Sequence, residues 1–96
     1  MAEPRTEIRA QLGDLITIEV ESNPTTGYDW VLDLPLDILH LESKRHTPSS
    51  DRIGAGGITS FRLHAISAGT AVVEGRYERA WEGTPAERRT WTIIVE

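Results

Sequence analysis

The chain has 96 residues, of which 39% are hydrophobic and 26% charged, with no cysteine and a net charge of −5 at pH 7. This length suits one domain with one core. The absence of cysteine excludes disulfides, thiolate nucleophiles and zinc sites built on cysteine. The acidic balance disfavours nucleic acid and anionic membrane surfaces as partners, because both are bound through basic patches.

The N-terminal segment, Met1–Arg9, lacks the apolar core of a signal peptide. No apolar run approaches the roughly 20 residues that a membrane-spanning helix needs. The chain as it stands therefore predicts no export signal. It fits a cytoplasmic protein or a mature secreted or periplasmic form, and the compartment stays open.

Apolar and polar residues alternate with a period of two along most of the chain, which predicts half-buried strands. A weak run over residues 8–12 comes first, and six clearer runs follow it. The side chains that we expect to face inward are those of Ile8, Ala10, Leu12, Ile16, Ile18, Val20, Tyr28, Trp30, Leu32, Leu39, Leu41, Phe61, Leu63, Ala65, Ala71, Val73, Tyr77, Trp91, Ile93 and Val95.

Turn residues such as Gly and Pro separate these runs, and about seven short strands at this spacing favour an all-β sandwich or barrel. The one helix candidate is Leu34–Leu39, which Pro35 limits. Neither a repeat nor a linker divides the sequence. We therefore expect residues 1–96 to form a single domain without a metal or a cofactor.

The first unusual loop is Asn23-Pro24-Thr25-Thr26-Gly27-Tyr28. Pro24 fixes its own φ and favours an extended Asn23, while Gly27 can adopt a positive φ. The threonine hydroxyls can bond nearby backbone groups. A loop stiffened in this way loses little entropy on binding, although the same residues would also suit a tight turn that only connects two strands.

The second loop ends in Gly54-Ala55-Gly56-Gly57, where three glycines would let a partner approach the backbone closely. A phosphate-binding loop would lead into a helix, but a predicted strand follows here. A flexible hairpin loop is the simpler alternative.

The third loop contains Arg79, Ala80 and Trp81. Trp81 has no alternating pattern to bury it, whereas Trp30 and Trp91 occupy inward positions. Exposed Trp and Arg are typical of binding hot spots. The alternative is that Trp81 folds back over the end of the sandwich.

These three motifs, in this order, resemble those of the chagasin family of cysteine protease inhibitors. The resemblance includes Trp30, Phe61 and the Ala68-Gly69-Thr70 turn, and it covers roughly residues 12–95. The first two motifs are complete. The third departs at Ala80, where the family usually has Pro, and this puts the stiffness of that loop in question.

The resemblance implies an immunoglobulin-like β-sandwich of about seven strands with the three loops at one end. It also implies a monomer that inhibits papain-like cysteine proteases reversibly and without a covalent bond. The protease-binding residues would be Asn23, Pro24, Thr25, Thr26, Gly27, Tyr28, Gly54, Ala55, Gly56, Gly57, Arg79, Ala80 and Trp81.

An enzyme is the first rival hypothesis. His40 and His64 fall at outward strand positions without metal-ligand spacing. A triad would need a rigid scaffold and an oxyanion hole, which a glycine-rich loop lacks. The residues that could suggest a triad are His46, Ser49, Ser50 and Asp51. Asp33 and Asp37 could suggest a pair of catalytic carboxylates, but ordinary solvation at the end of a strand explains them.

The second rival is a generic immunoglobulin-like binding or adhesion module without a protease target. Such a module would use a sheet face. The predicted sheet faces carry ordinary Thr, Glu and Arg residues, and the unusual residues lie in loops, which favours the inhibitor hypothesis.

Overall fold

The computed structural model describes residues 5–23, 26–48, 56–79 and 81–96. They form seven strands: β1 (Arg5–Ala10), β2 (Leu15–Ser22), β3 (Tyr28–Asp33), β4 (Leu39–Pro48), β5 (Gly57–Ala65), β6 (Gly69–Arg79) and β7 (Glu87–Val95). The described part of the chain holds no helix long and apolar enough to cross a membrane.

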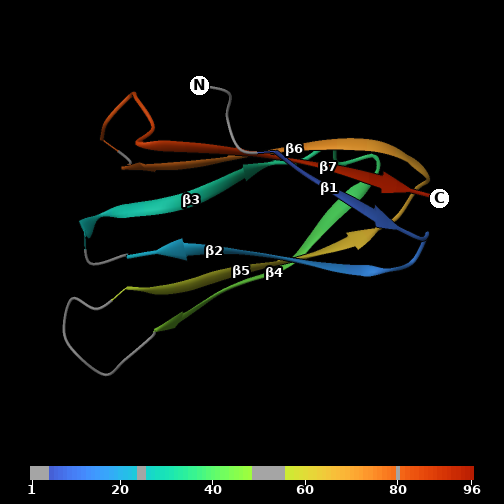
Figure 1. The fold of residues 1–96 in the computed structure, drawn as a ribbon, viewed down its shortest axis with the longest axis horizontal. Helices are drawn as coiled ribbons and strands as arrows, with labels where there is room; N and C mark the ends of the chain where they lie inside the picture. Colours follow the sequence, from blue (N-terminus) through green and yellow to red (C-terminus); the bar gives the residue numbers. More distant parts are fainter. Residues whose placement is uncertain (1–4, 24–25, 49–55, 80) are drawn as a thin grey trace.

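The strands form two layers, shown one above the other in Figure 1. One sheet has the order β1-β7-β6-β3 and the other the order β2-β5-β4. In an immunoglobulin-type sandwich the second, fifth and fourth strands likewise share one sheet, and the third, sixth and seventh share the other. The predicted immunoglobulin-like sandwich is therefore confirmed, and the barrel is excluded.

The core between the sheets is built by the predicted period of two. On β2 the residues alternate strictly between exposed and buried, and the inner positions of β5, β6 and β7 are likewise buried. Trp30 is fully buried and Trp91 is 6% exposed, so both are core residues as expected. The indole N–H of Trp30 donates to the Glu21 carbonyl at 2.9 Å and so links the two sheets.

Two inward predictions and one helix prediction were wrong. Leu12 is 58% exposed because β1 ends at Ala10, and Leu41 is 40% exposed on the edge strand β4 beside a register shift. The segment Leu34–Leu39 forms a turn, in which the amides of Ile38 and Leu39 both donate to the Pro35 carbonyl at 3.0 Å.

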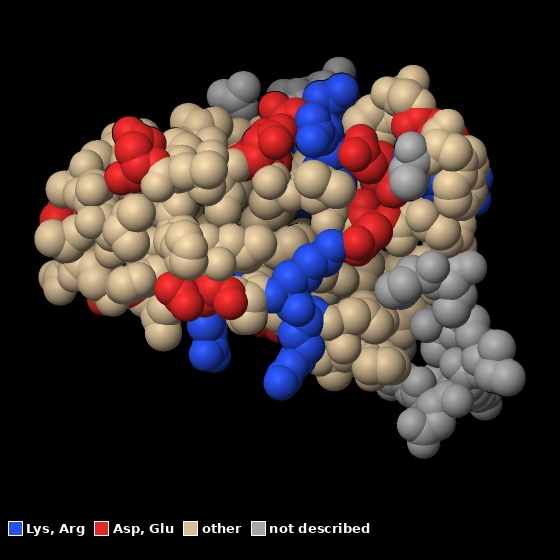
Figure 2. All heavy atoms as spheres, turned by 180° about the vertical axis from the view of Figure 1, so that it is seen from behind, with Lys and Arg blue, Asp and Glu red and all other residues tan. Residues whose placement is uncertain are grey.

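Charged side chains cover the outside of the sandwich. Figure 2 shows acidic and basic side chains interspersed on the face seen from behind. Several form exposed ion pairs, such as Arg88 with Glu74 at 3.0 Å. Exposed pairs of this kind contribute about 0–1 kcal/mol each, so the fold rests on the core. His40 and His64 lie outward as predicted, each within 3.5 Å of Glu42.

Candidate functional site

All three predicted loops lie at one end of the sandwich. The strands that border them, β2 and β3, β4 and β5, and β6 and β7, reach this end on the left of Figure 1. The antiparallel register carries the loops together, since Ser22 pairs with Gly57 and Tyr28 pairs with Arg79. The described motif residues, Asn23, Thr26, Gly27, Tyr28, Gly56, Gly57, Arg79 and Trp81, thus gather at this end. Pro24, Thr25, Gly54, Ala55 and Ala80 lie outside the described residues.

The first loop is held by its own hydrogen bonds. The amide and the hydroxyl of Thr26 donate to the Asn23 carbonyl at 3.1 and 2.7 Å, and the Tyr28 amide donates to the Thr26 hydroxyl at 3.4 Å. Gly27 has a φ of 84°, which only glycine adopts readily. The described part of this loop therefore has the local bonding that the sequence predicted.

A partner from the opposite half of the chain also fixes this loop. The Asn23 amide donates to the hydroxyl of Tyr77 on β6 at 3.0 Å. The Tyr77 ring stacks between Tyr28 and Trp30, with both centroid distances at 5.1 Å. Alternation predicted Tyr77 only as a core residue, and its role under the loop depends on the β3–β6 register, which sequence does not reveal.

The third loop packs directly on the first. The Arg79 guanidinium lies 4.2 Å from the Tyr28 ring centroid, and its Nε donates to the Thr26 carbonyl at 3.2 Å. A cation over an aromatic face is worth about 0.5–2 kcal/mol. Glu82, which the sequence did not single out, binds Arg79 Nη1 at 3.0 Å and receives the Tyr28 hydroxyl at 3.5 Å. The two loops therefore form one surface.

Trp81 stands on this surface with 72% of its area exposed. Its six-membered ring leans on Gly27, where an added Cβ would lie 2.7 Å from Trp81 Cη2. The Arg79 guanidinium is 5.8 Å from its ring centroid. Trp81 thus does not fold back into the sandwich, and an apolar face of this size remains available to a partner.

The second loop joins the surface through its described glycines. Gly57 is tightly enclosed, because an added Cβ would lie 2.2 Å from the Thr47 carbonyl oxygen. Beneath it, the hydroxyl of Ser22 bonds Thr59 and lies 3.0 Å from His46 Nδ1. This polar cluster ties β2, β4 and β5 together where the first and second loops begin. Of the residues considered for a triad, Ser49, Ser50 and Asp51 lie outside the described residues.

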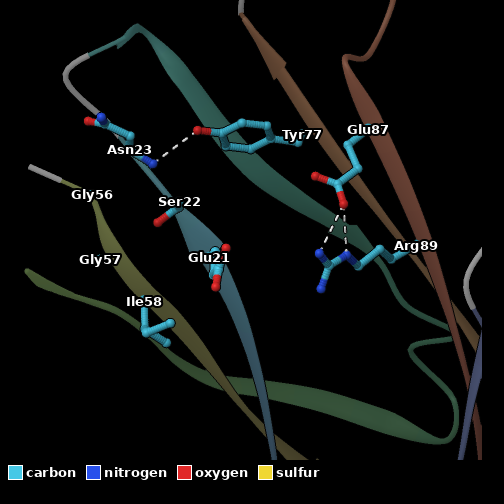
Figure 3. Close-up of a pocket in the computed structure, with 9 residues that line it drawn as sticks. All are labelled: Glu21, Ser22, Asn23, Gly56, Gly57, Ile58, Tyr77, Glu87 and Arg89. Atoms are coloured by element: carbon cyan, nitrogen blue, oxygen red, sulfur yellow. Dashed lines mark hydrogen bonds and ion pairs between the residues drawn. The ribbon is translucent and has the colours of Figure 1, made fainter. Parts of the chain in front are cut away.

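A pocket of about 480 Å³ lies between the ends of β2 and β5, where the first two loops begin, and the facing residues of β6 and β7 (Figure 3). Asn23 and Gly56 line its outer rim, while Tyr77 reaches across toward Asn23. On the far wall, Arg89 Nη2 pairs with Glu87 at 2.9 Å. The pocket thus lies between the two sheets, beneath the first loop, which connects them from Ser22 beside Gly57 to Tyr28 beside Arg79.

The Tyr77 hydroxyl provides a first test of this arrangement. We expect Tyr77→Phe to lower the free energy of unfolding by about 1 kcal/mol, because the part-buried Asn23 amide loses its acceptor while the ring stacking stays. Urea denaturation measures the change. Tyr28→Phe is the matched control, since its hydroxyl makes only a 3.5 Å contact. A loss no larger than that of the control would contradict the anchoring role.

The sandwich and its loop surface match a known class of proteins. The model of the chagasin family of peptidase inhibitors, I42, matches residues 9–95. The chain therefore belongs to the chagasin family, which is a family of peptidase inhibitors and not of enzymes. The predicted family membership is confirmed.

Individual relatives agree with this assignment. Chagasin of Trypanosoma cruzi is 32% identical over 88% of this chain and 83% of its own length. Amoebiasin-2 of Entamoeba histolytica is 28% identical over 97% of this chain and 80% of its own.

Solved structures share the fold. The crystal structure of the cysteine protease inhibitor EhICP2 from Entamoeba histolytica aligns with a TM-score of 0.79 and 25% identity, covering 98% of this chain and 97% of that one. PbICP-C, solved in complex with falcipain-2, aligns with a TM-score of 0.60 and 17% identity over 97% of this chain and 88% of that one. At that identity the second likeness concerns the fold alone.

Proposed function

We propose that residues 1–96 act as one inhibitor domain that occupies the active-site cleft of papain-like cysteine proteases reversibly and noncovalently. The observation that carries this proposal is the joint surface of the first and third loops. Trp81 is 72% exposed there and is braced by Gly27, while Arg79 is braced by Tyr28 and Glu82. A braced aromatic and arginine pair has the composition of a binding hot spot.

Each of the three loops contacts a different part of the protease cleft. The Asn23–Tyr28 loop enters the cleft near the catalytic Cys and His, the Gly54–Gly57 loop runs along one side, and Arg79 with Trp81 packs on the other. The likeness to EhICP2, a cysteine protease inhibitor, supports a cysteine protease as the target. The chain has no cysteine of its own with which to form a thiol-based bond to a target.

Preorganisation accounts for the strength of binding that we expect. Interfaces of standard size bury about 1,200–2,000 Å² and reach nanomolar affinity when little ordering is needed. The hydrogen bonds within the first loop and from Arg79 to Thr26 supply that order before binding. We therefore expect inhibition of papain-like enzymes by the monomer with an inhibition constant in the nanomolar range, as an order of magnitude.

Titration of papain and of a cathepsin L-type enzyme with the pure protein measures this constant. Trypsin is the control, and it should be spared because its cleft differs in shape. Equal potency against trypsin would contradict the proposal, and so would a protein–protease adduct that survives denaturation in a mass spectrum. Failure to inhibit either cysteine protease would favour the generic binding module instead.

A further inference from the structure

A second concavity, of about 500 Å³, lies on the outer face of the β2-β5-β4 sheet. Its volume is in the range of small-molecule sites, and none of its lining residues belongs to the three loop motifs. The residues that give it its chemistry are Thr17, Ser43, Arg45, Thr47, Ser60 and Arg62. We refer to these six residues as the outer-sheet concavity.

The strand register explains why these side chains converge. Arg62 on β5 stands between Thr17 on β2 and Ser43 on β4. Arg45 on β4 pairs with Ser60, which places it diagonally next to Arg62 on the same face. Diagonal neighbours lie about 7–8 Å apart, within reach of long side chains, so both guanidinium groups can bind one ligand.

These two arginines are unusual in having no ion pair. Among the described side chains, Arg45 and Arg62 have no carboxylate partner within 4.0 Å, whereas the other arginines do. Lys44 also lines the concavity but turns its ammonium to Asp29 and the Trp30 carbonyl. Two like charges on neighbouring strands repel each other, and a bound anion would remove that cost.

Among the described residues, no Asp or Glu lines the concavity, although the chain has a net charge of −5. Glu19 pairs with Ser60 on the same outer face and lies diagonal to Arg62, but it makes no ion pair with Arg62 within 4.0 Å and is not among the lining residues. Figure 2 shows Lys and Arg side chains projecting from the lower part of the molecule, the layer that this sheet occupies, with acidic side chains beside them. The positive charge is therefore confined to the lining residues, with Glu19 beside them, and this favours a small anionic ligand over a long polyanion.

We propose that the outer-sheet concavity binds a sugar that carries a sulfate or phosphate ester. Arg45 and Arg62 hold the oxyanion through charge-assisted hydrogen bonds, for which the guanidinium fork is well suited. The hydroxyls of Thr17, Ser43 and Ser60 can donate to or accept from sugar hydroxyls. The space of about 500 Å³ exceeds the size of one oxyanion and leaves room for the sugar body.

Titration of the ¹⁵N-labelled protein followed by NMR tests this proposal. The probes are glucose 6-sulfate, glucose 6-phosphate, inorganic sulfate, inorganic phosphate and glucose, all at one constant ionic strength. We expect both sugar esters to shift the amides of Ser43, Arg45, Ser60 and Arg62, and the ester with the lower dissociation constant identifies the preferred oxyanion. Added NaCl should weaken this binding through screening.

Matched variants locate the site. Arg45→Gln and Arg62→Gln should each weaken binding by about fivefold or more, because hydrogen bonds to charged groups are the strong ones. Arg9→Gln is the control with the same change in charge, at an exposed pair with Glu96, and it should bind like the parent protein. Equal losses in all three variants, or no shifts at the concavity with either ester, would overturn the proposal. Bare sulfate and phosphate binding as tightly as their sugar esters would overturn the sugar part.

Protease inhibition serves as an independent readout. Because no loop-motif residue lines the concavity, saturating glucose 6-sulfate should leave the inhibition constant for papain unchanged within twofold. The same holds for Arg45→Gln and Arg62→Gln. If papain and the sugar ester compete for the protein, the concavity is not a separate site. This conclusion holds however strongly the protein alone inhibits papain.

Discussion

Replacing Trp81 with Ala should raise the inhibition constant for papain about thirtyfold or more. This corresponds to about 2 kcal/mol, the loss typical of a hot-spot aromatic. Trp81 is 72% exposed, so its truncation should change the free energy of unfolding by no more than about 0.5 kcal/mol. Inhibition assays and urea denaturation of the same preparation separate the two effects.

Leu36→Ala is the matched control for this experiment. Leu36 is 71% exposed, and it lies in the turn between β3 and β4, at the end of the sandwich opposite the loops. This substitution also removes an exposed apolar side chain, and it should leave the inhibition constant for papain unchanged. If Trp81→Ala binds papain within twofold of the parent protein and folds normally, Trp81 belongs to the scaffold, and its assigned role in binding is wrong.

Gly57→Ala should damage the second loop through the fold itself. The new Cβ would lie 2.2 Å from the Thr47 carbonyl oxygen and 2.8 Å from the Pro48 Cα. Since both are backbone atoms, β4 and β5 must separate at this end, at a cost of about 1–3 kcal/mol. We expect inhibition of papain to weaken tenfold or more, because the loop that follows β4 moves with the strand.

Gly56→Ala provides the comparison within the same loop. At this position the nearest atom to an added Cβ is the Ser22 carbonyl oxygen, at 3.4 Å, an ordinary contact. Unfolding free energy should change by less than about 0.5 kcal/mol, so any loss of inhibition reports a close approach of the protease to the backbone. A Gly57→Ala protein as stable as the parent would show that the strand pair relaxes at no cost.

The sandwich was largely predictable because the alternation of side chains marks one buried face on each strand. Ile16, Ile18 and Val20 illustrate this, since all three are buried as expected. The expected burial of Leu41 was wrong for a different reason. Leu41 pairs in regular register with the buried Leu63, but it is 40% exposed because β4 is the edge strand of its sheet, and strand order cannot be read from alternation alone.

The site was predictable as a set of residues but not as an arrangement. Arg79 was singled out by its type and its motif, yet its bond to the Thr26 carbonyl joins positions 53 residues apart. The parallel pairing of β1 with β7 and the contact of Glu82 with the Tyr28 hydroxyl likewise depend on tertiary packing. Local sequence patterns do not encode such long-range partners.

The position of the loops on two different sheets has a consequence for how target preference can evolve. The second loop extends from β4 and β5 and the third from β6 and β7, whereas the first connects the two sheets, from Ser22 beside Gly57 to Tyr28 beside Arg79. The distance between the second and third loops is thus set by the spacing of the two sheets. Between the sheets Trp30 is fully buried, and its indole N–H donates to the Glu21 carbonyl of the opposite sheet. Core substitutions that change the spacing of the sheets would increase or decrease the distance between these two loops. Such an inhibitor can therefore adapt to clefts of different width through mutations that no protease ever touches.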